Sequence, residues 1–514
     1  MTGTTINELS AIELAARIAR GEVSAVEAVE AHIARVEEVN PRLNALVVKR
    51  YDEARREAQA VDERRRAGQA LGPLAGVPVT IKECLDLAGT PSTFGLESRR
   101  NAHASVDELH VARLRAAGAI VIGKTNVAQL LLFIETDNPV YGRTNHPDDP
   151  ERSCGGSSGG EGALLATGAS ALGLGTDIGG SVRVPAAFCG VYALKPTSGR
   201  CDDPGRFSVP VGQRAVPSQV GVLGRSARDV ALGLEIIHGG RTPSPDGTLA
   251  PPVALGDPAA IDVARLKIAW HDDDGTFAPS PAVRRAVRES AERLRARGAN
   301  VVAWTPPEVS RARDLFFALL SADGLAGCRR MLGRGRRDRR IAALALGASK
   351  PRLARALLGM TGRGRLAREI VANYGPAETD RYWQLVEAAL EYRRRFAEAA
   401  AGFDAILCPA TALPAYRHGA AEELVLAGAY TCLWNLLGWP AGIAPVTRVQ
   451  AGEESDRAPS DDKMDRAARE TERGSAGLPI AVQVAAPPWR EDVALAVMAA
   501  LEPEFARDRN RAAG

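Results

Sequence analysis

The sequence predicts an α/β protein built on a largely central sheet. Short apolar runs such as 77–81, 119–122, 191–194 and 405–409 alternate with stretches of helical periodicity along most of the chain. Apolar runs of this length, bounded by turn residues, are typical of strands that helices cover on both faces. With 514 residues, of which 45% are hydrophobic, the chain is long enough for a large core, and we treat residues 1–514 as one domain.

The composition excludes several classes of function. The formal net charge is only +3, which gives no argument for nucleic acid as a partner. The seven cysteines and seven histidines are dispersed without CxxC or His-x-x-x-His spacing, so we expect neither a disulfide framework nor a metal site. The first residues lack the features of a signal peptide, and no window approaches the roughly twenty apolar residues of a spanning helix. We therefore predict a cytoplasmic protein that acts on a small molecule without metal or cofactor.

Residues 1–70 are predicted to form a helical lead-in. Capping boxes, in which a serine is followed three residues later by a glutamate, begin at Ser10 and Ser24 and mark the starts of two helices. The second of these helices is expected to stop at the Asn40-Pro41 dipeptide, because proline disrupts a helix interior. A third, highly charged helix is expected over 51–66.

The second half of the chain contains two charged segments. Residues 328–368 are rich in arginine with interleaved leucines, and are predicted to form a basic, cap-like helical segment. A basic amphipathic helix pair of this kind can lie on a membrane surface, but a solvated helical hairpin explains the pattern equally well. The sequence leaves both open, as it leaves open a homodimer. Residues 452–472 are predicted to be a charged surface insertion, between a long helix over 382–401 and a final strand over 478–484.

The chemistry is predicted from a stretch rich in glycine and serine. It runs from Ser153 to Gly162 and is followed by Gly175–Ser181, so that Ser157 and Ser181 each follow a pair of glycines. Glycine allows sharp bends and leaves backbone N–H groups open to a ligand, which is what an oxyanion requires. The flanking segments are apolar, unlike those of a flexible linker.

Two other motif matches compete with this one. Gly118–Thr125 fits the phosphate-loop pattern GxxxxGK[ST], which would make the chain a nucleotide-binding protein. The four residues between its glycines are Ala-Ile-Val-Ile, however, and indicate a strand rather than an open loop. Gly155–Gly159 fits the G-x-S-x-G nucleophile elbow of α/β-hydrolases, but the later His238, His271 and His418 lie in no evidently prepared context.

A third interpretation joins Lys82, Ser157 and Ser181. Lys82 stands at the end of the predicted 77–81 strand. A neutral lysine can accept a proton through one serine hydroxyl and so activate a second serine as a nucleophile. Lowering its pKa from ~10.4 to ~7–8 costs about 4 kcal/mol, which burial can supply. Backbone N–H groups of residues 178–181 would then bind the oxyanion, and the scheme needs neither histidine nor metal.

Three motifs together resemble the amidase signature family of serine hydrolases. They are Gly76–Lys82, the Gly-Gly-Ser-Ser-Gly-Gly loop at 155–160, and Gly175–Pro185. The resemblance implies a Ser–Ser–Lys triad on an α/β/α sandwich with a central mixed sheet of about eleven strands and helices on both faces. It covers nearly the whole chain, and the segments that follow the fatty acid amide hydrolase branch of the family are 82–84, 125–129, 157–163, 188–190, 436–446 and 477–483.

The resemblance also implies roles for individual residues. By position, Lys82 is the general base, Ser157 the proton relay and Ser181 the nucleophile that forms the acyl-enzyme. The remaining positions are Ile178, Gly179, Gly180 and Ser181 for the oxyanion hole, Leu131 for the wall of an acyl pocket, and Ser158, Asp177 and Arg183 for support.

The function implied is that of a serine amidase that hydrolyses carboxylic amides, with hydrophobic acyl groups in keeping with this branch. The glutaminase subunit of a tRNA-dependent amidotransferase shares the triad and is the alternative. Nucleotide binding through Gly118–Thr125 is a more remote one. The acyl length and the amine that leaves are not fixed by the sequence, and segment 328–368 is the candidate for peripheral membrane contact.

Overall fold

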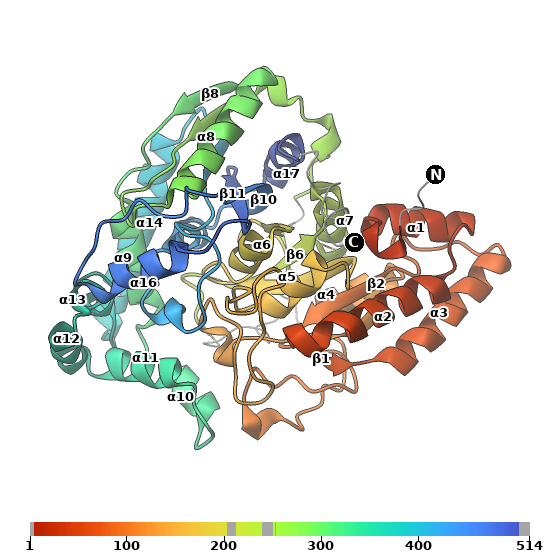
Figure 1. The fold of residues 1–514 in the computed structure, drawn as a ribbon, viewed down its shortest axis with the longest axis horizontal. Helices are drawn as coiled ribbons and strands as arrows, with labels where there is room; N and C mark the ends of the chain where they lie inside the picture. Colours follow the sequence, from red (N-terminus) through yellow and green to blue (C-terminus); the bar gives the residue numbers. More distant parts are fainter. Residues whose placement is uncertain (1–4, 203–211, 239–249, 252, 503–514) are drawn as a thin grey trace.

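The computed structural model describes residues 5–202, 212–238, 250, 251 and 253–502. Within these residues, a mixed sheet of eleven strands forms the centre and helices surround it, which confirms the predicted α/β fold (Figure 1). The strands are β1 (Leu46–Lys49), β2 (Pro78–Lys82), β3 (Ile120–Thr125), β4 (Leu172–Asp177), β5 (Tyr192–Lys195), β6 (Gln219–Gly224), β7 (Lys267–Trp270), β8 (Asn300–Ala303), β9 (Ala405–Pro409), β10 (Ala441–Arg448) and β11 (Pro479–Ala485).

Helices pack on both sides of this sheet. Helices α6 and α8 lie on one side of β10 and β11, and α17 lies on the other side, next to α7, which covers β5 and β6 (Figure 1). The α-helices of the described residues are α1 (Ala11–Arg20), α2 (Ala25–Leu43), α3 (Tyr51–Arg66), α4 (Leu109–Ala116), α5 (Gly159–Ala166), α6 (Arg183–Cys189), α7 (Ala227–His238), α8 (Pro281–Ala296), α9 (Val309–Leu320), α10 (Ala326–Leu332), α11 (Arg339–Ser349), α12 (Pro351–Met360), α13 (Gly364–Glu369), α14 (Thr379–Ala399), α15 (Cys432–Leu437), α16 (Lys463–Glu472) and α17 (Glu491–Ala500).

The strand order brings the motifs of the sequence together. It is β1-β3-β2-β4-β6-β5-β10-β11-β9-β7-β8, with β2 parallel to both β3 and β4. The register pairs Ile81 with Leu174, so that the ends of β2 and β4 point in the same direction. Lys82, the last residue of β2, therefore lies beside the end of β4, just before the second glycine-rich turn.

The lead-in is helical as predicted, with two differences. Both capping boxes form, and α3 has the predicted bounds. Helix α2, however, continues past Pro41 to Leu43, because a proline in the last turn removes only one backbone hydrogen bond. The lead-in also contributes β1, which pairs antiparallel with β3 at the edge of the sheet.

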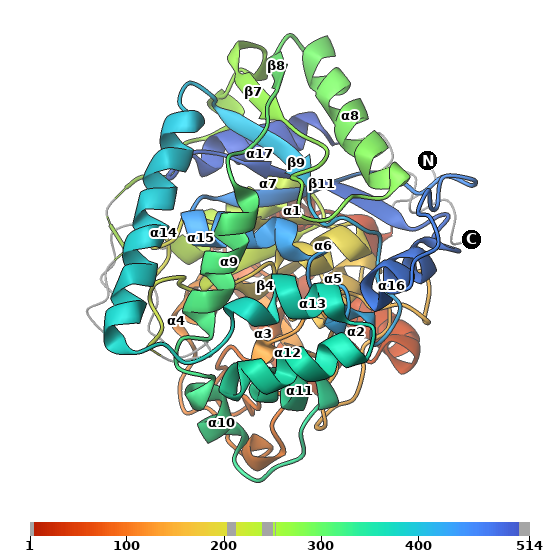
Figure 2. The ribbon, with the colours of Figure 1, turned by 90° about the vertical axis from the view of Figure 1, so that its left-hand side faces the viewer.

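The arginine-rich segment 328–368 differs from the predicted helix pair. It contains α11, α12 and most of α10 and α13, which lie beside α9 and α14 (Figure 2). The breaks occur where the chain carries Gly333 and Gly362, both at positive φ, and where Pro351 starts a new helix. Within the described residues, no helix is long and apolar enough to cross a membrane.

The charged segment 452–472 is more ordered than a simple surface excursion. Its second half forms α16, which buries Met464, Ala468 and Glu472. The Glu472 carboxylate accepts hydrogen bonds from Ser455 and from Arg457 Nε, which fixes the first half of the segment to the second.

Candidate functional site

The centre of the candidate site is a hydrogen bond between Lys82 and Ser157. The Lys82 side chain is fully buried, and its Nζ lies 2.8 Å from Ser157 Oγ. The same nitrogen donates to Thr176, at 2.9 Å from Oγ1 and 3.2 Å from the carbonyl oxygen. Three oxygen acceptors thus fix the direction of the amine, and the structure brings together two of the three predicted catalytic side chains.

Burial changes the proton affinity of this amine. Removal from water disfavours the charged ammonium form and lowers the pKa of Lys82 to about 8. A lysine with a pKa of about 8 is roughly one-tenth neutral at pH 7 and half neutral at pH 8, and a neutral amine can accept a proton. The geometry and the pKa therefore suit Lys82 as a base that acts on the Ser157 hydroxyl.

The third predicted residue, Ser181, is held against this pair through the backbone. The Ser158 N–H donates to the Ser181 carbonyl oxygen at 3.1 Å, which ties the two serine-bearing turns to each other. Ser181 is 7% exposed, whereas Ser157 is fully buried, so the outer serine is the one that a substrate can reach. In the described part of the chain, the Ser157 and Ser181 hydroxyls do not hydrogen-bond to each other directly. The Ser158 Oγ is buried without a hydrogen-bond partner there.

Close packing explains the glycines that precede Ser157. Gly155 has φ 81°, and a Cβ on it would lie 2.8 Å from the Pro185 Cα. A Cβ on Gly156 would lie 2.7 Å from the Glu135 nitrogen and 2.8 Å from the Phe133 carbonyl oxygen. Real Cβ atoms do not approach backbone so closely, so side chains at these two positions would displace the serine turn.

The turn after β4 presents backbone N–H groups, and Asp177 organises them. Its carboxylate accepts hydrogen bonds from the N–H groups of Gly180 at 2.8 Å and Val182 at 3.1 Å. Gly180 was predicted to donate to an oxyanion, but its N–H is directed to this carboxylate instead. The N–H groups of Ile178, Gly179 and Ser181 have no acceptor within the described residues, so these three are the candidate oxyanion donors.

Asp177 and Arg183 stabilise the turn from inside the protein. Burial opposes ionisation of Asp177, but the charge and hydrogen bonds of the Arg183 guanidinium outweigh it and hold the pKa of that carboxyl well below its usual range. Arg183 Nη1 also donates to the Thr431 carbonyl oxygen and to Gln483 Oε1, at 2.9 and 2.8 Å. The two predicted supporting residues therefore connect the turn to Thr431, the residue just before α15, and to β11.

Leu131 lies in a short 3₁₀ turn, η3 (Gln129–Leu131), before the serine loop. It has φ 59°, is half-buried and packs against the main hydrophobic core. The ring of Phe316, from α9, lies against Gly179 in the turn after β4: a Cβ on Gly179 would be 3.0 Å from the outermost carbon of this ring.

Sequence reasoning missed three polar residues at this site. The Thr176 hydroxyl accepts a hydrogen bond from Lys82. Thr176 lies inside the Gly175–Ser181 motif, next to Asp177, so its position in the sequence could have identified it as a site residue. Glu161 is fully buried, receives hydroxyl hydrogen bonds from Thr80 and Thr125, and has its pKa raised to about 8 by burial. Thr136 bonds to both ends of the serine loop and carries no local sequence signal.

The competing phosphate-loop motif does not form the site that it would require. Most of Gly118–Thr125 is strand β3, and Lys124 Nζ is turned to the Pro91 carbonyl oxygen at 2.6 Å and to Ser92 Oγ at 2.9 Å. This confirms the prediction that the segment is a strand rather than a phosphate loop. The described residues also contain no group of three or more His, Cys, Asp or Glu placed to hold a metal.

Comparison with known proteins gives a consistent result. The family model described as Amidase matches residues 27–495. The chain is 32% identical over 526 residues to fatty acid amide hydrolase 1 of Caenorhabditis elegans, covering 97% of this chain and 88% of the relative. It is 33% identical over 510 residues to fatty-acid amide hydrolase 1 of Sus scrofa, covering 97% and 86%. A solved structure of fatty acid amide hydrolase superposes with a TM-score of 0.83 at 26% identity, covering 96% of this chain and 85% of that one.

Proposed function

The chain belongs to the amidase signature family and is an amide-hydrolysing enzyme of the fatty acid amide hydrolase type, and from this premise we propose that it cleaves amides with hydrophobic acyl groups through a Ser181 acyl-enzyme. The observation that carries the proposal is the buried Lys82 amine, 2.8 Å from Ser157 Oγ. Ser157 relays protons between Lys82 and Ser181. The same comparisons favour this function over the glutaminase subunit of an amidotransferase.

Acylation begins with neutral Lys82. The amine takes the proton of Ser157, Ser157 takes the proton of Ser181, and the Ser181 oxygen attacks the amide carbonyl carbon. The carbonyl oxygen becomes an oxyanion beside the N–H groups of Ile178, Gly179 and Ser181, where each donor contributes ~3–4 kcal/mol of transition-state stabilisation in comparable hydrolases.

Collapse of the tetrahedral intermediate breaks the carbon–nitrogen bond. The leaving amine takes a proton from Ser157, which is resupplied by the Lys82 ammonium, so that the relay returns to its starting state. The acyl group remains as an ester on Ser181. Water then attacks this ester with the same relay acting as base, and the products are a carboxylic acid and free Ser181.

Apolar groups near the turn support a hydrophobic acyl group. Phe316 lies against Gly179 and packs edge-on to Phe317, which in turn packs edge-on to Tyr374 with centroids 5.6 Å apart. A cavity of about 590 Å³ lies beyond these rings, between α9, α12 and α14, and includes Tyr374 in its wall. None of the three proposed catalytic residues lines this cavity, so the rings rather than the cavity carry this part of the proposal.

The decisive test is a Ser181→Ala variant assayed with a long-chain anilide and labelled with a fluorophosphonate probe. We expect loss of both turnover and labelling, because the nucleophile is removed. The matched control is Ser198→Ala, which removes a hydroxyl that has no hydrogen-bond partner in the described structure. Wild-type turnover by Ser181→Ala would exclude Ser181 as the nucleophile.

Substrate class needs a separate assay. Anilides of graded acyl length, compared with glutamine on the isolated chain, distinguish a hydrophobic acyl pocket from a glutaminase site. We expect kcat/KM to rise with acyl length and glutamine to be a poor substrate. Faster hydrolysis of glutamine than of every anilide would reverse this assignment.

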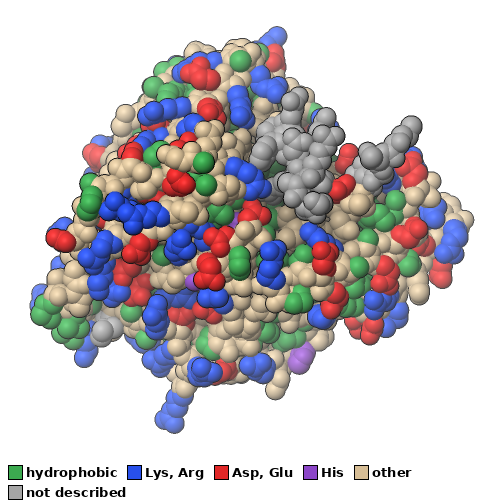
Figure 3. All heavy atoms as spheres, viewed as in Figure 1, with side chains coloured by type: hydrophobic (Ala, Val, Ile, Leu, Met, Phe, Trp, Pro, Cys, Tyr) green, Lys and Arg blue, Asp and Glu red, His purple; other side chains and the backbone are tan. Residues whose placement is uncertain are grey.

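Because amides with hydrophobic acyl groups partition into lipid, we also propose that segment 328–368 contacts an anionic lipid surface. Helix α12 exposes Leu353, Leu357 and Met360 on one side, and Met360 is 76% exposed. Figure 3 shows hydrophobic and basic side chains together at the corner that α12 occupies in Figure 1. We expect Met360→Glu to weaken co-sedimentation with anionic vesicles, and Val106→Glu, at an exposed apolar residue outside this segment, to leave it unchanged. Equal effects of the two variants would contradict this role.

A further inference from the structure

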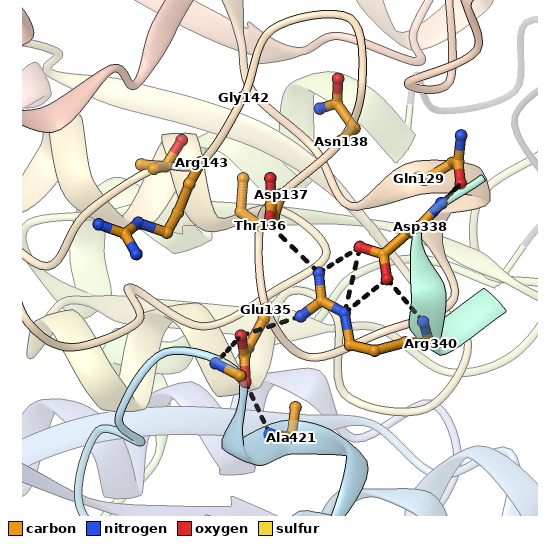
Figure 4. A network of polar contacts seen from close by, with 12 residues as sticks. Gln129, Glu135, Thr136, Asp137, Asn138, Gly142, Arg143, Asp338, Arg340 and Ala421 are labelled. Carbon is orange, nitrogen blue, oxygen red and sulfur yellow. Dashed lines mark hydrogen bonds and ion pairs between the residues drawn. The ribbon is translucent and has the colours of Figure 1, made fainter. Parts of the chain in front are cut away.

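One arginine of the basic segment behaves differently from its neighbours. Arg340, at the start of α11, is 5% exposed, whereas Arg336, Arg337 and Arg339 are exposed. Its guanidinium faces three carboxylates: Glu135 at 2.9 Å, Asp338 at 2.5 Å and Asp137 at 3.6 Å (Figure 4). It also lies over the Phe133 ring, 5.5 Å from its centroid.

The carboxylate of Glu135 is a junction between three segments. Besides Arg340, it accepts hydrogen bonds from the backbone N–H groups of Gly419 at 2.8 Å and Ala421 at 2.6 Å. Both side chains of the pair are almost completely buried, at 5% and 4% exposed. A buried and fully bonded ion pair of this kind fixes the relative positions of the segments that carry it.

The backbone next to Glu135 touches the serine loop. As shown above, the Phe133 carbonyl oxygen and the Glu135 nitrogen leave no space for a side chain on Gly156. The next residue, Thr136, accepts from the Gly159 N–H at 3.0 Å and donates to the Gly155 carbonyl oxygen at 2.9 Å. Thr136 therefore clamps both sides of Ser157.

A second contact holds the basic segment in register with this loop. Gln129 Nε2 donates to the Arg336 carbonyl oxygen at 3.0 Å, and Gln129 Oε1 accepts from the Asp338 N–H at 2.8 Å. Gln129 thus hydrogen-bonds to the backbone on both sides of Arg337 and fixes the segment that places Arg340 beside Glu135 (Figure 4).

From these contacts we propose that Arg340 is a positioning residue for acyl transfer: its ion pair with Glu135 holds residues 133–136 against the serine loop and so holds Ser157 in line with Lys82. The proposal deepens the proposed function and rests on it. It assigns part of the basic segment to the geometry of the proton relay. Arg340 lies 205 residues from Glu135 along the chain, and Glu135 directly precedes Thr136, which bonds to both sides of the serine loop.

The first experiment measures kcat and KM per fluorophosphonate-labelled site in Arg340→Met and in Arg334→Met. Arg334 is exposed and has no described partner, so it is the matched control. We expect Arg340→Met to lose about tenfold to a hundredfold in kcat, with little change in KM, because small misplacements of reacting groups carry costs of this size. Unchanged kcat in Arg340→Met would overturn the proposal.

The second experiment separates positioning from simple stabilisation. Arg340→Met leaves two nearly buried carboxylates, Glu135 and Asp338, without their counter-charge. The double variant Glu135→Gln with Arg340→Met removes the more deeply buried of these two charges, so its melting temperature should recover part of the way towards the wild type. Its kcat should stay low, because the tie to residues 133–136 is still missing. Recovery of kcat together with the melting temperature would show that the pair is only structural, and would overturn the proposal. The double variant also keeps the test available if Arg340→Met alone does not fold.

A readout independent of turnover distinguishes this inference from the proposed function. Hydrogen exchange of peptides that contain the Gly159 N–H should be faster in the double variant than in Arg334→Met, because the Thr136 clamp is released. If the wild type cleaves no amide but exchange still increases, the proposed function fails and the tie stands. If the wild type is active and exchange is unchanged, the tie fails and the function stands.

Discussion

Asp177 and Arg183, six residues apart in the chain, form an ion pair in which neither side chain is accessible to solvent. Arg183 Nη2 lies 2.9 Å from Asp177 Oδ1, and Nε lies 3.0 Å from Oδ2. The carboxylate also accepts hydrogen bonds from backbone N–H groups of the turn that contains Ser181 and from the Asn435 side-chain amide. The pair is thus the internal frame of the turn, and the direction of the open N–H groups depends on it.

Asp177→Asn should destabilise the protein and inactivate it. The variant leaves the Arg183 guanidinium buried without its counter-charge, and the NH₂ group of the new amide would face N–H donors instead of an acceptor. Removing one partner of a buried ion pair costs about 3–5 kcal/mol of unfolding free energy in comparable proteins. Chemical denaturation and anilide turnover check both effects. The comparison variant is Glu391→Gln, which breaks an exposed pair with Arg394 and should cost less than about 1 kcal/mol. Similar losses of unfolding free energy in the two variants would show that burial does not make the Asp177–Arg183 pair more important for stability than an exposed pair.

The rate of acylation should follow the protonation of Lys82. Because the neutral amine is the base and its pKa is lowered to about 8, kcat/KM should rise as the pH passes about 8 and then level off. Lys82→Ala should lower the rate by about 10²–10⁴-fold, and its remaining activity should keep rising with hydroxide instead of levelling off. A pH–rate profile from pH 6 to pH 10 measures this. An inflection near pH 8 that survives in Lys82→Ala would assign it to another group.

Much of this scheme follows from local patterns, and the reasons are physical. Strand 405–409 and helix 51–66 were predicted with the bounds that the structure shows, because apolar runs and helix-starting residues are local signals. The Lys82–Ser157 contact was predicted because both residues lie in short motifs. Helix α2 passed its predicted end, since packing on the core outweighs the cost of a late proline.

Contacts between distant segments had no such signal. Asn435 and Gln483 bind Asp177 and Arg183 from about 250 to 300 residues further along the chain, and only the strand order brings them there. The use of the Gly180 N–H by Asp177 depends on the φ of one residue, which a sequence pattern does not specify. Arg340 looked like one arginine among many, because its partner Glu135 is 205 residues away.

Lys82 should also reduce the stability of the fold that it serves. Its pKa is about 8 in the folded protein and 10.5 in the reference state, so below pH 8 the folded protein carries the full cost of a buried charge. Unfolding free energy should therefore rise with pH between about 8 and 10.5. Lys82→Met should raise stability by about 1–2 kcal/mol at pH 7, and this gain should shrink as the pH approaches 10.5. Melting temperatures across that range test it, with Lys267→Met at an exposed lysine as the control. A gain that is constant with pH would contradict the role of charge.

Gly180 offers a test of the turn that separates backbone strain from lack of space. It has φ 121°, and a Cβ on it would lie 2.2 Å from Thr431 Oγ1, a hydroxyl already bonded to the Gly179 carbonyl oxygen at 2.7 Å. Gly199 also has positive φ, at 87°, but a Cβ there would meet nothing within 4 Å. Gly199→Ala should lower the free energy of unfolding by about 1 kcal/mol from strain alone and keep full activity. Gly180→Ala should lower it further and reduce kcat by at least about tenfold, because Thr431 must move and would carry the Gly179 peptide with it. Denaturation midpoints and anilide turnover of the two variants test whether lack of space at Gly180 matters beyond strain. Equal stability losses with unchanged turnover would mean that this turn tolerates displacement.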